Sequence, residues 1–110
     1  MVCLLDSGVN NLHPLLQSFL PDSNLYTYNE SWGTGDSARS GGHGTGVAGL
    51  TLYGDLTDAL SHSERIQIFY GLESYKIFHP QSSNDPELYG AITISAVLTP
   101  VIDRPNNPRV

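Results

Sequence analysis

The chain has 110 residues, one cysteine and a formal net charge of −6 at pH 7, a size that suits one small domain with a modest core. Charged residues make up 15% of the sequence, which argues against a disordered tail because such tails combine high net charge with few apolar residues. The acidic balance disfavours nucleic acid and anionic membrane surfaces as partners, since phosphate binding needs clustered Lys and Arg.

The first half of the chain predicts a strand, a short helix and a second strand. Residues 2–5 form an apolar run without alternation that ends at Asp6, a pattern typical of a strand buried on both faces of a parallel sheet. Residues 13–20 carry apolar side chains at helical spacing between two prolines, which predicts a short helix. Residues 25–28 predict a second strand, and residues 29–42 are rich in Gly and Ser and predict a loop.

A helix is predicted from His43 to about Tyr53, with Gly54 and Asp55 ending it. Its sequence, HGTGVAGLTLY, contains three glycines, and each Gly costs up to about 1 kcal/mol in a helix interior. We therefore expect another part of the chain to approach this helix closely.

The second half predicts one long strand or two short ones, and then a helix. Residues 66–70 and 74–78 are β-prone. Asp85 and Pro86 suit the start of a helix, and Pro100 is expected to kink or stop it. One face of this helix would carry Leu88, Ala91, Ile92, Ser95, Ala96 and Thr99. Strands alternating with helices predict an α/β fold with a mostly parallel sheet and crossover helices.

Two side chains at the ends of these elements could perform chemistry. Asp6 stands at the carboxyl end of the first strand, where open α/β sheets place their ligands, and His43 opens the glycine-rich helix. An Asp that accepts a hydrogen bond from His fixes its tautomer, so that the other ring nitrogen can take a proton from a nucleophile. Taken singly, an Asp before Ser-Gly, like Asp6, is more often a turn residue that bonds its own backbone, and a His beside glycines, like His43, is more often a solvated loop residue.

Read together, the two segments resemble the subtilisin-like serine peptidases. Asp6-Ser7-Gly8 is followed by His13-Pro14, as in that family. The helix opens with HGTGVAG, which agrees with the family's HGTHVAG at six of seven positions. The departure is Gly46, which stands in place of a second, non-catalytic His. Residues 75–77 resemble the strand after the catalytic helix, and residues 88–97 resemble the helix that follows, so the resemblance covers nearly the whole chain.

The resemblance implies a catalytic pair within an incomplete domain. Asp6 would be the triad carboxylate and His43 the general base, while residues 1–110 would form the N-terminal portion of a subtilisin-like peptidase domain. The nucleophilic Ser and the oxyanion Asn are expected outside this segment, because no Ser here lies in a Gly-x-Ser-x-Gly or Gly-Thr-Ser context. We therefore expect a serine endopeptidase in the intact protein and no activity from this segment alone. A non-catalytic fragment or interaction module and a metal-dependent Asp/His hydrolase remain alternatives.

No cofactor is expected. The resemblance allows a structural calcium ion, but Asp55, Asp58 and Glu64 lack the spacing of an oxygen-ligand loop, which favours a solvated acidic surface. The four histidines and single cysteine have no zinc-site spacing. The sequence GTGVAG from Gly44 to Gly49 matches the dinucleotide fingerprint, but a loop rather than a strand precedes it.

The expected partners are a polypeptide substrate and the rest of the catalytic domain, with no nucleic acid and no membrane. The resemblance places the first strand centrally, beside a strand that would begin near Arg109, so we expect this segment either to be marginal in stability or to pair that strand edge with another chain. No signal peptide or membrane span is evident. Cys3 lies in an apolar run, which predicts a buried inert thiol, and the absence of a disulfide favours the cytoplasm.

Overall fold

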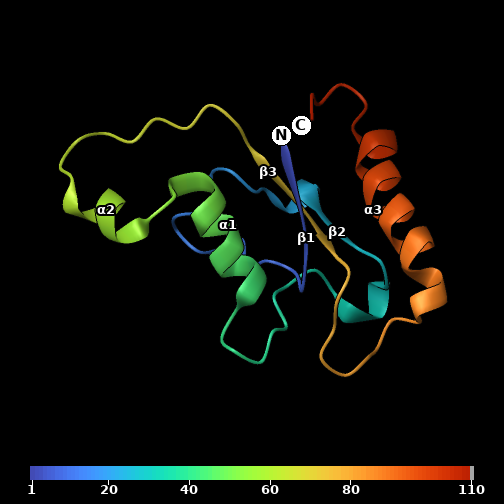
Figure 1. Cartoon of the computed structure of the whole chain (residues 1–110). Helices are drawn as coiled ribbons and strands as arrows, with labels where there is room; N and C mark the ends of the chain where they lie inside the picture. Colours follow the sequence, from blue (N-terminus) through green and yellow to red (C-terminus); the bar gives the residue numbers. More distant parts are fainter. Residues whose placement is uncertain (110) are drawn as a thin grey trace.

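A computed structural model describes residues 1–109 and shows a three-stranded parallel sheet flanked by helices (Figure 1). The strands are β1 (Val2–Asp6), β2 (Leu25–Thr27) and β3 (Leu72–Lys76), in the spatial order β1-β3-β2. The remaining elements are η1 (Asp22–Asn24), η2 (Glu30–Trp32), α1 (His43–Tyr53), α2 (Leu56–Ser61), η3 (Pro86–Leu88) and α3 (Tyr89–Asp103). The expected α/β class, incomplete in this segment, is confirmed.

β3 is the central strand, and all five of its residues are buried. Its side chains alternate between the two faces of the sheet. Leu72 packs in the core cluster on the side of α1, whereas the Tyr75 hydroxyl lies 2.9 Å from the Ser95 hydroxyl of α3. The sheet is therefore sandwiched between α1 and α3 (Figure 1).

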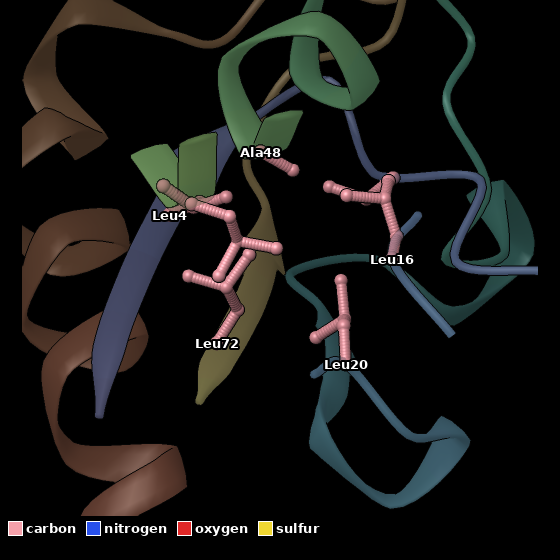
Figure 2. Packing of buried hydrophobic residues seen from close by; sticks show 7 residues of the cluster. Leu4, Leu16, Leu20, Ala48 and Leu72 are labelled. Carbon is pink, nitrogen blue, oxygen red and sulfur yellow. The ribbon is translucent and has the colours of Figure 1, made fainter. Parts of the chain in front are cut away.

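The main core lies between the sheet and α1. Figure 2 shows Leu4 of β1, Leu72 of β3 and Ala48 of α1 gathered with Leu16 and Leu20. Each of these side chains is at most 7% exposed. This packing holds α1 against the sheet beside the carboxyl end of β1, where the candidate site lies.

β1 is less buried than its continuous apolar sequence predicts. Among the described residues it pairs only with β3, and Leu5, on the side of α3, is 41% exposed. The prediction of a strand buried on both faces is therefore wrong for β1 in this structure, and β3 is the strand that is buried throughout.

Residues 13–20 do not form the predicted helix. They form successive turns, in which His13 O accepts from the Leu16 amide at 2.8 Å and Leu16 O accepts from the Leu20 amide at 2.9 Å. The spacing still identified the inward side chains, since Leu16 and Leu20 are both buried. The Asn11 side chain donates to Leu20 O at 3.0 Å, so the segment closes on itself as a loop.

The segment before β3 contains less strand and more helix than the sequence predicts. Residues 66–70 are not a strand, because the register begins with Val2 opposite Leu72 and no described strand lies beside the earlier residues. β-prone residues without a neighbouring strand have no ladder to join. The helix α2 was not predicted; its N-cap is Asp55, whose side chain accepts from the Thr57 amide at 2.8 Å.

α3 continues through Pro100 to Asp103, so the expectation that Pro100 stops the helix is wrong. Its buried side is narrower than predicted and consists of Ile92, Ala96 and Pro100. Arg109 is not the start of a strand; its guanidinium donates to Pro100 O at 2.6 Å, and Val110 lies outside the described residues. Within residues 1–109, no helix is both long and apolar enough to cross a membrane.

Candidate active site

β1 carries Asp6 to the carboxyl edge of the sheet, where a tight turn follows. Gly8 has φ +95°, and a Cβ added there would lie 2.4 Å from Gly35 O. Only glycine fits such a conformation and such a close approach. The loop carrying Gly35 is therefore packed directly onto the end of β1.

α1 brings His43 to the same place through a second close contact. A Cβ added at Gly44 would lie 2.1 Å from Gly8 O and 3.3 Å from the Asp6 Cβ. The expectation that another segment approaches the helix backbone is thus confirmed at Gly44. It fails at Gly46, where an added Cβ would meet nothing within 4 Å.

The structure brings Asp6 and His43 into direct contact. His43 Nδ1 lies 2.9 Å from both carboxylate oxygens of Asp6, which fits a ring that donates its Nδ1–H and keeps Nε2 as the acceptor. The Asp6 side chain is 14% exposed and that of His43 is 65% exposed. The carboxylate is therefore sheltered, while most of the His43 side chain is exposed to solvent.

The electrostatics of the pair favour a proton on His43. Its pKa is raised above the ordinary value, first by the hydrogen bond to Asp6 and then by the charge of that carboxylate, with the charge of Asp36 acting in the same direction. Asp6 is itself held in place, because its Oδ1 accepts from the Ser7 amide at 2.7 Å. A fixed carboxylate and a basic imidazole together can orient and accept a proton, which is the task of a general base and its partner.

The other histidines lie apart from this pair. His13 Nδ1 accepts from the Leu15 amide at 3.2 Å, a local capping contact. His62 is exposed on the end of α2, where its ring lies 3.8 Å from Asp58. His79 is half-buried, and its ring stacks on that of Trp32 with the ring centroids 5.7 Å apart.

Of the acidic residues considered as calcium ligands, Asp55 caps α2 with its side chain. Within residues 1–109, the His43 ring hydrogen-bonds to Asp6 alone, and no three His, Cys, Asp or Glu side chains converge as a metal ion requires. Burial raises the pKa of the Cys3 thiol to about 11, which makes it a poor nucleophile.

Two residues close to the pair were not predicted as part of the site. Asp36 lies in the loop expected over residues 29–42, and its side chain accepts hydrogen bonds from Thr45 in the first turn of α1. Lys76, at the end of β3, is 1% exposed and donates to Gly35 O at 2.7 Å. Neither lies in a periodic pattern, so only the spatial arrangement reveals them.

Comparison with known proteins gives one match. A family model described as the subtilase family matches residues 1–110. No curated protein and no solved structure gives a significant match. The matched range contains both Asp6 and His43.

Proposed function

This chain belongs to the subtilase family, a family of serine peptidases, and on that premise we propose that it supplies the acid–base half of a serine endopeptidase site. His43 is the general base that takes the proton of a nucleophilic serine and returns it to the leaving amine. Asp6 holds the His43 tautomer and stabilises the imidazolium. The observation that supports this most directly is the 2.9 Å contact of His43 Nδ1 with both oxygens of Asp6.

The proposal places the nucleophilic serine and the oxyanion asparagine outside residues 1–110. The substrate is then a polypeptide, attacked at a carbonyl carbon to give an acyl-enzyme that water hydrolyses. No step needs an organic cofactor. The exposed side of the His43 ring is where the serine hydroxyl would have to arrive.

The test is peptide hydrolysis by the longer protein that this proposal requires. His43→Ala is expected to lower turnover by about 10⁶-fold, the loss measured in subtilisin itself when its catalytic histidine is removed. Asp6→Asn should lower turnover by about 10⁴-fold, because the wrong tautomer is then favoured. His62→Ala, an exposed histidine on α2, is the matched control and should leave turnover unchanged.

A second measurement concerns residues 1–110 alone. A fluorophosphonate probe labels activated serines, and we expect it to leave this chain unlabelled. Labelling of any serine in the chain would overturn the assignment of the nucleophile. Full peptide hydrolysis by the His43→Ala variant of the longer protein would overturn the role of His43 as general base, and no hydrolysis by the unmodified longer protein would favour the alternative, a non-catalytic interaction module.

A further inference from the structure

Asp36 makes the side-chain hydrogen bonds of a helix N-cap, although it is not the N-cap residue of α1. The N-cap residue of α1 is Gly42, which makes no side-chain capping bond. Asp36 Oδ2 instead accepts from the Thr45 amide and from the Thr45 hydroxyl, each at 2.7 Å. Thr45 is the third residue of α1, so Asp36 satisfies one of the amides that every helix leaves open at its start.

The other oxygen of Asp36 reaches back to β1. Asp36 Oδ1 accepts from the Ala38 amide at 3.1 Å and lies 3.0 Å from the Ser7 hydroxyl. That hydroxyl is also 3.0 Å from Asp6 Oδ1. Ser7 has one hydroxyl proton, so it can donate to only one of the two carboxylates at a time.

The loop that carries Asp36 is anchored to the sheet. The buried Lys76 ammonium donates to Gly35 O at 2.7 Å and to Trp32 O at 3.3 Å, and Asn10 Oδ1 accepts from the Asp36 amide at 3.0 Å. Burial lowers the pKa of Lys76, and the charge of Asp36 opposes that effect. The loop that carries Asp36 is thus held by Lys76 at the end of β3, and Asp36 itself is held by Asn10 in the turn after β1.

We infer that Asp36 is a positioning residue for the Asp6–His43 pair: it ties the first turn of α1 to the end of β1 and places a second negative charge near the His43 ring. That this role serves catalysis rests on the proposed function; the hydrogen bonds of Asp36 to Thr45 and Ser7 do not depend on it. Removal of the Asp36 charge should reduce the proton affinity of His43 in two ways. It removes an attraction, and it weakens the acceptor that competes with Asp6 for the Ser7 hydroxyl, so that Ser7 donates more fully to Asp6 and weakens Asp6 as an acceptor for His43.

The test is an NMR titration of the His43 ring in residues 1–110, together with amide exchange at Thr45. Asp36→Asn keeps the shape of the side chain but replaces one oxygen by NH₂, which must then face either the Thr45 amide or the Ala38 amide. We expect a lower His43 pKa than in the unmodified chain, and exchange at Thr45 faster by about tenfold or more, the scale of a lost charge-assisted hydrogen bond. An unchanged His43 titration with unchanged Thr45 exchange would overturn the inference.

The matched control is Asp55→Asn, which changes the N-cap of α2 in the same chemical way. It should leave the His43 titration and the Thr45 exchange as they are. A shift of the His43 titration as large as that of Asp36→Asn would show a general loss of charge or stability and would overturn the positioning role.

Asp36→Glu separates position from charge and serves if the Asn variant does not fold. It retains the negative charge on a longer side chain, so Thr45 exchange should accelerate while the His43 titration stays closer to that of the unmodified chain. Unchanged Thr45 exchange in this variant would overturn the capping contact. Each readout is independent of peptide hydrolysis, so failure of the inference and failure of the proposed function are distinguishable.

Discussion

His43 links the candidate site to the stability of the fold. Its pKa in the folded chain is raised, chiefly by the hydrogen bond to Asp6, above the ordinary value of about 6.5. A raised folded pKa means that protonation favours the folded state. The stabilisation should be complete below about pH 6.5 and should disappear as the pH rises through the raised folded value.

The measurement is urea unfolding at several pH values, compared between the unmodified chain and His43→Gln. The free energy of unfolding of the unmodified chain should fall relative to that of the variant over this range. In the Asp6→Asn background, the His43→Gln change should no longer alter how the free energy of unfolding depends on pH, because the carboxylate that raises the His43 pKa is absent. A difference that grows with increasing pH would contradict the assigned ionic contact.

Two glycines of α1 should respond oppositely to the same substitution. Gly44→Ala places a Cβ 2.1 Å from Gly8 O, and we expect a loss of about 2 kcal/mol or more in the free energy of unfolding. Gly46→Ala meets nothing within 4 Å and should gain about 0.5–1 kcal/mol from helix propensity. Urea unfolding of both variants checks this, and equal effects would show that the approach of α1 to the β1 turn is wrong.

At the level of residues, the sequence was sufficient to predict Asp6 and His43 as site residues but not to predict the residues around them. Asp6 and His43 stand at element ends and within recognisable motifs, so their proximity could be expected. Asp36 lies in a loop whose path depends on the buried ammonium of Lys76 and on contacts at Gly8. Such contacts join segments far apart in the chain and leave no local pattern.

At the level of elements, prediction worked where local and tertiary preferences agree. α1 begins and ends at the expected residues, since Gly54 at φ +65° terminates it. Prediction of secondary structure failed where strand pairing or tertiary packing determines the conformation. Residues 66–70 have no strand beside them, and residues 13–20 bury two leucines without becoming a helix. α3 also runs through Pro100 to Asp103, and Pro100 O accepts from the Arg104 amide at 2.9 Å and from the Arg109 guanidinium at 2.6 Å.

Arg109 and Glu73 should contribute strongly to the docking of α3. Glu73 of β3 is completely buried, and Arg109 contacts its two oxygens at 2.8 and 2.7 Å. Arg109→Met leaves that carboxylate buried without its partner, which should lower the free energy of unfolding by about 3–5 kcal/mol. Chemical denaturation measures the loss.

The double variant Glu73→Met with Arg109→Met is the control for this pair. A buried ion pair replaced by apolar side chains of similar size is often close to neutral, so most of the stability should return. If the double variant were as unstable as the single one, the loss would come from the helix-end carbonyls that Arg109 also binds rather than from Glu73.

At the level of the whole molecule, the chain exposes more surface than a compact protein of its size. Its accessible surface is 7020 Å², against roughly 5,900 Å² for a typical monomer of this mass. Part of the excess is apolar: α3 exposes Ile94, Val97, Leu98, Val101 and Ile102 by 40–75%. Among the described residues, β1 also keeps one unpaired edge, so the surface combines the two features that promote association.

We therefore expect residues 1–110 to self-associate as the concentration rises, through the free edge of β1. Leu5→Lys places a charge on that strand at a position 41% exposed, and charged edge residues disfavour strand pairing. Sedimentation or solution scattering should show a smaller average mass for this variant than for the unmodified chain at the same concentration. Leu60→Lys, on α2 and 74% exposed, removes the same apolar side chain elsewhere and should leave association unchanged. A stable monomer of the unmodified chain at high concentration would contradict the role of the edge, and an equal effect of both variants would indicate general hydrophobic association instead.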